Sequence, residues 1–247
     1  MNHLFSLFLM FMTFLSGGQV TIHLVGDSTM ADKPHPETNP ERGWGQMLHE
    51  FFSESVTILN HAVNGRSTRS FLSEGKWEAV RSTLSPGDYV FIQFGHNDEK
   101  NHDSSRYTNP WTGFRRNLAR FVLDAREKGA IPVLFTPVVR RNFNDDGVLE
   151  DTHGAYPFVM RDVARELNVP LIDLQLKTED LVRSLGPEPS KDLYMWITPG
   201  AYAMYPEGKQ DNTHFTAAGA RAVARLAAEG VRDSRLPLAT MVKLPEK

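Results

Sequence analysis

The chain has 247 residues, 40% of them apolar, which is enough for one α/β domain with a sizeable core. Its formal net charge of −3 and its pI near 6.3 provide no basic field, so nucleic-acid binding has no electrostatic support. Because the chain has no cysteine, a disulfide framework, a thiolate zinc site and a cysteine nucleophile are excluded.

The first residues are typical of a secretory signal peptide. Residues 4–15 form an almost unbroken apolar run, too short to span a bilayer as a mature helix, and Ser16, Gly17 and Gly18 follow it. We therefore expect cleavage near Gly18, a secreted or periplasmic protein, and no stable membrane association after cleavage. The alternative is a buried N-terminal helix, but the first strand follows too soon to leave room for a turn. Without a cysteine, a lipoprotein anchor is excluded.

From residue 20 onward, apolar strands alternate with amphipathic helices. The first half contains a strand over residues 20–26, a proline-rich loop over 31–41, a helix over 45–53, a strand over 56–59, a loop over 60–70 and a helix over 76–84. Next come a strand over 89–94, a loop over 101–110, a helix over 114–127, a strand over 131–136 and a loop over 137–152. The chain continues with a helix over 156–167, a strand over 171–174, a helix over 178–185, a loop over 186–210, a helix over 215–229 and a tail over 236–247.

Five apolar strands that alternate with helices predict one domain, residues 19–235, with a parallel sheet covered by helices on both faces. In such sheets, ligands bind outside the carboxyl ends of the strands. The polar segments at Ser28, Gly65, Asn97 and Pro137 all follow strands. We therefore expect them to share one edge of the sheet.

Ser28 is the candidate nucleophile at this edge. A serine hydroxyl attacks poorly by itself and needs a base, a group that orients the base, and donors for the developing oxyanion. In Asp211-Asn212-Thr213-His214 a carboxylate stands three residues before an imidazole, so the acid can hold one ring nitrogen while the other faces Ser28. The alternatives are local: Ser28 as a cap or turn residue, and Asp211 with His214 as a capping pair before the last helix.

Four motifs together resemble one family. Taken alone, Gly65 is an ordinary turn glycine and Asn97 an Asx-turn residue, but the four motifs in order contain every part of an acyl-transfer site. With VGDSTM, NHAVNGRSTRSF, QFGHND and DNTHF, the chain resembles the SGNH (GDSL-type) hydrolases and, among them, the rhamnogalacturonan acetylesterase branch. The similarity runs from the first strand to the last helix.

This resemblance implies a fold and a set of roles. The fold is a three-layer α/β/α domain with a five-stranded parallel sheet, as in flavodoxin. Ser28 would attack the ester carbonyl, His214 would act as the base and Asp211 would orient it. The backbone N–H groups of Ser28 and Gly65 and the side-chain amide of Asn97 would form the oxyanion hole. Activity would then fall as the pH drops through about 6.5, where an ordinary imidazole gains a proton.

The remaining polar residues suggest no metal or cofactor. No pair of histidines or acids has the spacing of metal ligands, and the implied mechanism needs neither group. Asp27 is expected to brace the loops of the site, or to be a turn residue. His23, His49 and His61 are assigned to packing or hydrogen bonding.

Candidate substrate contacts follow from the polymer that the resemblance implies. Rhamnogalacturonan carries galacturonate carboxylates, which arginines near the strand ends would bind, and sugar rings, which aromatic side chains would stack against. The candidates are Arg66, Arg69, Arg140, Arg141, Tyr107 and Trp111. For any one arginine the simpler alternative is a solvated side chain or one paired with Asp145, Asp146 or Glu74. For the aromatic residues it is a loop anchor.

The sequence therefore predicts a serine carbohydrate esterase that removes acetyl groups from a pectic polysaccharide through an acyl-serine intermediate. One alternative is the same machinery acting on another acetylated glycan, a lipid ester or a thioester, although the polar loops over residues 31–41 and 101–110 favour a sugar. Another is a noncatalytic glycan-binding protein, which gives no reason for Ser28, Asp211 and His214 to occur together. The expected partner is an acetylated polysaccharide and not a nucleic acid, and the oligomeric state stays open.

Overall fold

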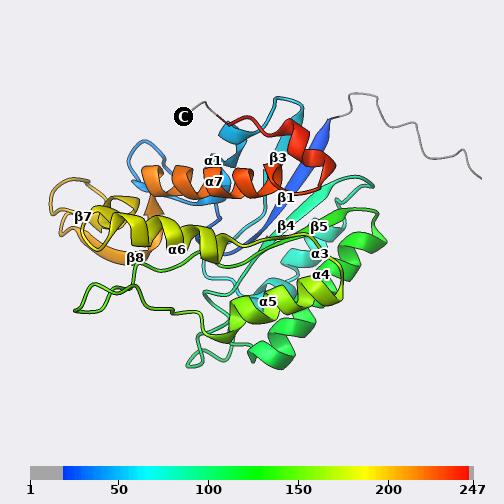
Figure 1. Ribbon diagram of the computed structural model, residues 1–247, viewed down its shortest axis with the longest axis horizontal. Coiled ribbons are helices and arrows are strands. Elements are labelled where there is room, and N and C mark those ends of the chain that lie inside the picture. The colour runs from blue at the N-terminus through cyan, green and yellow to red at the C-terminus, as the bar shows by residue number, and fades with distance from the viewer. Residues whose placement is uncertain (1–18, 245–247) are drawn as a thin grey trace, which may run out of the picture.

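The central element is a five-stranded sheet in which every strand is parallel to its neighbours. The computed structural model describes residues 19–244, and the predicted leader, residues 1–18, lies outside them. In spatial order the strands are β3 (Val56–Asn60), β1 (Val20–Gly26), β4 (Tyr89–Gln93), β5 (Ile131–Phe135) and β6 (Leu171–Ile172) (Figure 1). The predicted parallel sheet is confirmed.

Helices cover both faces of this sheet (Figure 1). One face carries α1 (Trp44–Met47), α6 (Leu174–Leu185), α7 (Ala217–Arg232) and the 3-10 helices η1 (Leu48–Phe51) and η4 (Pro237–Met241). The other carries α2 (Thr68–Ser73), α3 (Lys76–Arg81), α4 (Arg115–Glu127) and α5 (Ala155–Glu166). Side chains of β4 enter the two cores alternately: Phe91 packs with the first set, and Val90 and Ile92 with the second. The three-layer α/β/α fold is confirmed, and within residues 19–244 no helix is long and apolar enough to cross a bilayer.

The strand order reverses between β1 and β4. From β1 the chain first goes outward to β3 and then returns to place β4 on the other side of β1. A reversal of this kind leaves a crevice outside the carboxyl ends of the two strands, where open α/β sheets bind ligands. Ser28 follows β1 and Asn97 follows β4, so both residues belong to loops that border this crevice.

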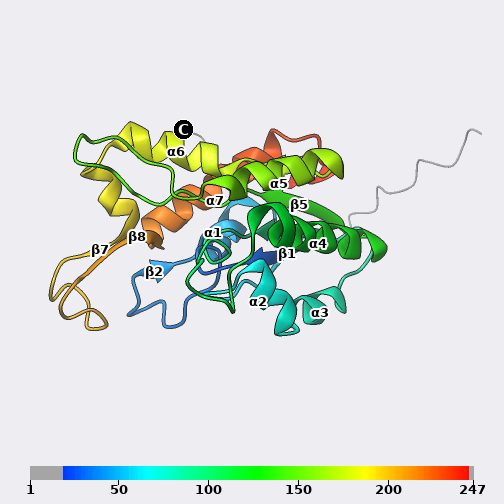
Figure 2. The same ribbon diagram turned by 90° about the horizontal axis from the view of Figure 1, so that it is seen from below.

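A three-stranded antiparallel sheet at one end of the molecule is missing from the sequence-based prediction (Figure 2). It contains β2 (Glu41–Arg42), β8 (Lys209–Thr216) and β7 (Tyr194–Ile197), with β8 in the middle. Residues 186–210, predicted as a loop, therefore include η3 (Pro189–Leu193) and β7. The prediction fails because β8 is polar along most of its length and pairs with distant segments, so no apolar alternation marks it.

One helix, α2, is missing from the sequence-based prediction, and another, α6, begins earlier than predicted. The loop expected over residues 60–70 changes to α2 after Ser67, whose Oγ accepts from Ser70 N at 3.2 Å, while Ser70 Oγ accepts from Ser67 N at 2.9 Å. This capping box starts the helix in a segment whose serines look loop-like. Similarly, α6 begins after Asp173, whose carboxylate accepts from Leu176 N at 3.3 Å.

The C-terminal segment, predicted as a tail from residue 236, packs against the core. Leu238 of η4 is buried, and Val242 forms a β-bridge with Phe52. The segment lacks periodicity because it is a short 3-10 helix followed by an extended stretch, and neither gives an amphipathic pattern.

Candidate active site

The turn after β1 is held by a chain of hydrogen bonds that begins deep in the protein. Asp27 is fully buried, and its Oδ1 accepts from Thr29 N at 2.9 Å and from Thr29 Oγ1 at 2.8 Å. Thr29 Oγ1 accepts from Gln93 Nε2 at 2.8 Å, and Gln93 Oε1 accepts from Trp44 Nε1 at 2.6 Å. The turn that presents Ser28 is therefore fixed from both β4 and α1.

Asp27 stays ionised although it is buried. Burial has the largest influence and favours the neutral acid, but the charge and hydrogen bond of His96, together with the two hydrogen bonds from Thr29, lower the pKa of Asp27 to about 2. His96 Nδ1 lies 3.2 Å from Asp27 Oδ2. Asp27 therefore joins the turn after β1 to the loop after β4.

Asp211 and His214 reach the same side of β8 because this strand is bulged. In a regular strand, residues three positions apart point to opposite faces. Tyr194 of β7 pairs with Phe215 of β8, but the next residue, Met195, pairs with Asp211. Residues 212–214 of β8 therefore have no partner on β7. The bulge turns the imidazole of His214 back toward the carboxylate.

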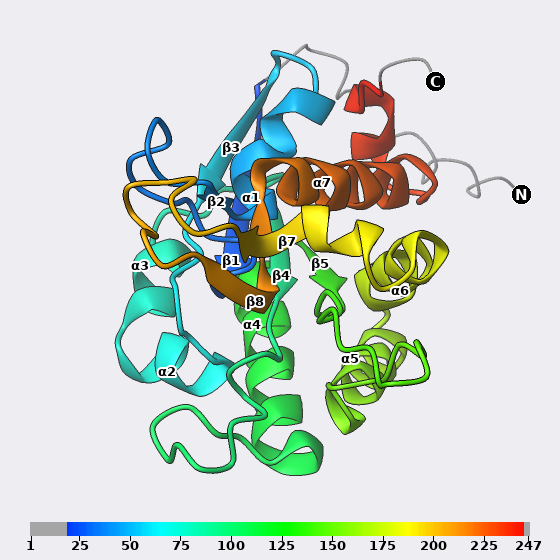
Figure 3. The ribbon, with the colours of Figure 1, turned by 90° about the vertical axis from the view of Figure 1, so that its left-hand side faces the viewer.

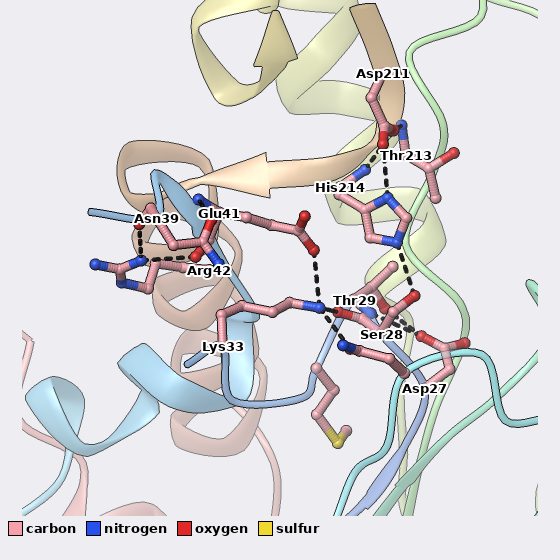
Figure 4. A network of polar contacts seen from close by, with 12 residues as sticks. Asp27, Ser28, Thr29, Lys33, Asn39, Glu41, Arg42, Asp211, Thr213 and His214 are labelled. Atoms are coloured by element: carbon pink, nitrogen blue, oxygen red, sulfur yellow. Dashed lines mark hydrogen bonds and ion pairs between the residues drawn. The ribbon is translucent and has the colours of Figure 1, made fainter. Parts of the chain in front are cut away.

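Ser28, His214 and Asp211 form a continuous hydrogen-bonded chain (Figure 4). Ser28 Oγ lies 2.9 Å from His214 Nε2, and His214 Nδ1 lies 2.8 Å from Asp211 Oδ2. The other carboxylate oxygen accepts from the backbone N–H groups of Thr213 at 2.8 Å and His214 at 3.0 Å. The capping alternative does not apply, because the cap of α7 is Thr216.

The carboxylate of Asp211 is held in its ionised form. Burial favours the neutral acid, but the hydrogen bond and charge of His214, with the backbone N–H groups, hold the pKa of Asp211 well below its usual range. Lys209 Nζ lies 3.1 Å from the same carboxylate oxygen as His214. Because an ionised carboxylate only accepts, Nδ1 of His214 carries the proton, and Nε2 faces the hydroxyl of Ser28 as an acceptor.

The three predicted oxyanion donors lie on the loops after β1, β3 and β4. Within residues 19–244, the backbone N–H groups of Ser28 and Gly65 have no protein acceptor. Gly65 has a φ of +75°, a conformation that glycine adopts without strain. Asn97 is buried, and its Nδ2 donates to Arg66 O at 3.1 Å, which leaves the second N–H of the amide for another acceptor.

A buried lysine links two of these turns, and sequence reasoning missed it. Lys33 is 4% exposed, and its Nζ donates to Ser28 O at 2.7 Å and to Asn64 Oδ1 at 2.6 Å and pairs with Glu41 Oε1 at 2.9 Å. All three ammonium hydrogens therefore have acceptors, as a buried ammonium requires. Because Asn64 precedes Gly65, Lys33 ties the turn of Ser28 to the turn of Gly65.

Glu41 and Lys209 extend this charge chain to Asp211. Lys209 Nζ lies 3.5 Å from Glu41 Oε2 and 3.1 Å from Asp211 Oδ2. Burial opposes ionisation of Glu41, but Lys33 and then His214 lower the pKa of Glu41 below its usual value. The one feature of the sequence that could have indicated the Lys209–Asp211 pair is its two-residue spacing. This spacing places both side chains on one face only if the segment is a strand.

Of the four predicted substrate arginines, two pair with carboxylates of the protein and a third is buried. Arg66 Nε lies 2.9 Å from Glu74 Oε2, which is one of the alternatives considered from the sequence. Arg140 forms an ion pair with Glu99. Arg141 is buried and joins the loop after β5 to η3 and β8 through its guanidinium.

The other candidates lie around α2 and the loop before α4. Arg69 is exposed, and its Nη1 donates to Tyr107 O at 3.4 Å. Arg69 and Tyr107 line a common cleft. Trp111 lies in the π-helical turn η2 (Pro110–Phe114) and is not among the cleft residues; its ring meets that of Phe158 edge-on, with centroids 5.8 Å apart.

The three histidines assigned from the sequence to packing or hydrogen bonding make hydrogen bonds inside the protein. His23 Nδ1 and His61 Nε2 are 3.1 Å apart and their rings stack, while His49 Nδ1 lies 3.0 Å from Gln46 O. Burial, followed by the charge of His23, lowers the pKa of His61 to about 4. In the part of the chain that the structure describes, no three His, Asp or Glu side chains gather as metal ligands would.

Asp98 fixes the start of α2 against the loop before α4, a role that sequence reasoning also missed. Its buried carboxyl group accepts from Thr68 N at 3.0 Å and from Thr108 Oγ1 at 2.7 Å. Burial outweighs these hydrogen bonds and raises the pKa of Asp98 to about 7. The role of Asp98 was missed because the sequence does not show which polar side chains of the Gly-His-Asn-Asp motif point into the protein and which point into the site.

This geometry agrees with the comparison of the chain with known families. The sequence profile of the GDSL-like lipase/acylhydrolase family matches residues 24–222, a range that includes the turn of Ser28 and the bulged strand β8. The chain therefore belongs to this family.

Within the family, the chain belongs to the rhamnogalacturonan acetylesterase branch. Rhamnogalacturonan acetylesterase RhgT of Bacillus subtilis is 47% identical over 219 residues, which cover 89% of this chain and 92% of the relative. The probable rhamnogalacturonan acetylesterase YesY of the same organism is 37% identical over 88% of this chain and 94% of its own length. Rhamnogalacturonan acetylesterase of Emericella nidulans is 30% identical over 83% of this chain and 81% of its own length.

Solved structures support the fold. YxiM of Bacillus subtilis superposes with a TM-score of 0.74 at 29% identity; the match covers 86% of this chain but only 56% of that longer chain. An acetylxylan esterase from Geobacillus stearothermophilus gives a TM-score of 0.60 at 18% identity over 87% of this chain and 94% of that one. At 18% identity the second likeness shows the fold alone.

Proposed function

We propose that the protein is a serine esterase that removes acetyl groups from a rhamnogalacturonan-type pectic polysaccharide. The observation that carries the proposal is the chain from Ser28 Oγ through His214 to Asp211, with distances of 2.9 and 2.8 Å. The proposed reaction class comes from the family to which the protein belongs. The proposed substrate class comes from relatives named rhamnogalacturonan acetylesterases, of which one is 47% identical.

In the proposed reaction, Ser28 Oγ attacks the acetyl carbonyl while His214 Nε2 takes its proton. The imidazolium that forms is stabilised by the ionised Asp211, and the oxyanion is held by the N–H groups of Ser28, Gly65 and Asn97. Collapse of the tetrahedral intermediate breaks the bond to the sugar oxygen, which receives the proton from His214. Water then attacks the acetyl-serine with His214 again as the base, and acetate leaves.

The test is acetate release from acetylated rhamnogalacturonan, acetylated xylan and acetyl-CoA. The proposal expects the first substrate to be preferred, and Ser28→Ala to abolish release while leaving the fold intact by circular dichroism. Ser55→Ala, which removes an exposed hydroxyl away from the site, serves as the matched control. Equal rates on all three substrates contradict the pectic specificity, and full activity of Ser28→Ala contradicts the serine mechanism.

We also propose that the protein acts outside the cytoplasm, as a secreted or periplasmic enzyme. Support comes from the apolar run at residues 4–15, followed by small residues. Sequencing the N-terminus of protein recovered from the medium or periplasm is expected to give a chain that starts near Gln19. Recovery only from the cytoplasm, with Met1 or Asn2 first, contradicts the proposal.

A further inference from the structure

A surface cleft of about 680 Å³ lies between α2, the loop before α4 and α4 itself. In Figure 3, α2 and α4 lie below the small sheet, with that loop beneath them. The cleft is lined by Arg69 of α2, by Arg116 and Arg120 of α4, and by Tyr107 of the loop, and we call it the arginine cleft.

The arginine cleft contains three guanidinium groups and no carboxylate among its lining residues. Within residues 19–244, Arg116 has no acidic partner and makes no hydrogen bond through its side chain. Arg120 Nε lies 3.5 Å from Asp124 Oδ2, an oxygen that already accepts from Trp77 Nε1 at 2.8 Å. The three positive charges are therefore poorly neutralised by the protein.

This arrangement differs from a mixed, solvated helix face. Arg116 and Arg120 are four residues apart on α4, and like charges at this spacing destabilise a helix by about 0.2–0.5 kcal/mol. The adjacent Arg115 lies on the same helix but is held by both Asp162 and Glu166. The same helix thus carries Arg115, which is paired with two carboxylates, Arg116, which has no acidic partner within residues 19–244, and Arg120, which has one long contact with Asp124 and keeps its other donors for an outside anion.

The cleft is connected to the active site by two short segments. Arg69 follows the Gly65 turn by four residues, and the carbonyl of Arg66 between them accepts from the Asn97 amide at 3.1 Å. Thr108, next to Tyr107, is bonded to the carboxyl group of Asp98, the residue after Asn97. The same two segments therefore carry both the predicted oxyanion donors and the lining of the cleft.

We propose that the arginine cleft binds galacturonate carboxylates of the same polymer chain and so acts as an acidic-saccharide subsite beside the active site. The inference rests on the function proposed above. Guanidinium groups form paired hydrogen bonds to carboxylates, and the ring of Tyr107 offers a surface for a sugar ring. The subsite selects polymers that carry negative charge and contributes nothing to the reaction at the acetyl carbon.

The variant that tests the subsite is Arg116→Gln/Arg120→Gln. Its control is Arg165→Gln/Arg183→Gln, which removes the same charge from two exposed arginines that have acidic partners outside the cleft. With acetylated rhamnogalacturonan, the cleft variant is expected to raise KM about tenfold, as expected for the loss of charge-assisted hydrogen bonds, with kcat unchanged. With 4-nitrophenyl acetate, a small neutral ester, both variants should match the wild type. An unchanged KM for the polymer, or an equal rise in the control, overturns the subsite.

A binding experiment separates this inference from the proposed function. Polygalacturonate fragments without acetyl groups are titrated calorimetrically into Ser28→Ala, alone and combined with Arg116→Gln/Arg120→Gln. Binding that weakens about tenfold in the combined variant supports the subsite even if no ester is ever hydrolysed. Equal binding by both proteins overturns the subsite even if acetate release proceeds as proposed.

Discussion

The active-site rim and the arginine cleft use charge in opposite ways. At the rim, the buried ammonium of Lys33 has three acceptors, and the carboxylate of Asp27 is held by Thr29 and His96. In the cleft, Arg116 has no acidic partner among residues 19–244. Paired buried charges hold atoms in fixed positions, whereas exposed, unpaired guanidinium groups keep their donors for a ligand. The comparison shows that the contacts of a charged side chain within the protein, rather than its charge alone, indicate whether it holds the structure or is available to a ligand.

The largest effect is expected from Asp211→Asn, which removes the charge at the end of the catalytic chain. The asparagine side chain has one acceptor oxygen where the carboxylate has two, and it lacks the charge that stabilises the imidazolium, so kcat should fall by about 10⁴-fold. The measurement is kcat with 4-nitrophenyl acetate, with thermal unfolding to show that the variant folds. Asp192→Asn, an exposed site, is the control. A loss of less than about tenfold would show that Asp211 does not act through His214.

The next effect is expected from Lys33→Met, which breaks the link between the turns of Ser28 and Asn64. Small displacements of catalytic groups and loss of an oxyanion donor each cost about 10²-fold, so kcat should fall by roughly this factor. Breaking a buried ion pair also destabilises the fold by about 3 kcal/mol, so kinetics are measured well below the unfolding temperature. Glu41→Gln keeps the hydrogen bonds of the Lys33 ammonium to Ser28 O and Asn64 Oδ1, so it should lose less activity than Lys33→Met. Equal losses in the two variants would mean that activity depends on the ion pair and not on the link between the two turns.

These two predictions also show what the sequence could and could not reveal. The parallel sheet was predictable because each of its strands is an apolar run, and the motifs that supply Ser28, Gly65 and Asn97 follow such strands directly. The roles of Lys33 and Glu41 were not predictable, because they depend on acceptors from distant segments. Their loop and β2 are too short and too polar to give a pattern.

The position of His214 shows the same limit. Asp211-Asn212-Thr213-His214 was recognised as a motif, but not as part of a strand, and the bulge that turns both side chains to one side depends on pairing with β7. Likewise, Arg66 and Arg69 were predicted equally as substrate contacts. Their difference arises from Glu74, which lies against Arg66 and not against Arg69.

A smaller effect is expected on stability at acid pH, from His61→Gln. The pKa of His61 is about 4 in the folded protein and near 6.5 in an unfolded chain, so the unfolded state binds more protons between these values. Stability of the wild type therefore falls as the pH drops from 6.5 to 4. Since the ring is only partly buried, we expect about 1–2 kcal/mol for this contribution.

The test compares unfolding free energies of His61→Gln and the wild type at pH 7.5 and pH 4.5. The variant should gain stability relative to the wild type at the lower pH. Asp98, whose pKa of about 7 is raised, has the opposite dependence and stabilises the fold as the pH falls, but it does so equally in both proteins. A difference that stays constant with pH would show that the His23–His61 pair does not titrate as inferred.

The smallest effect is expected from Arg66→Gln, and it sharpens the comparison most directly. Arg66 is as near to the oxyanion turn as any predicted substrate arginine, but Glu74 already accepts from its Nε at 2.9 Å. A partly exposed ion pair contributes about 0–1 kcal/mol, so stability should barely change, and KM for the acidic polymer should change by less than about twofold. Glu74→Gln should do the reverse and lower KM slightly, because it frees the guanidinium for the polymer. If Arg66→Gln raises KM as much as Arg116→Gln/Arg120→Gln does, pairing inside the protein does not separate structural arginines from those that bind substrate.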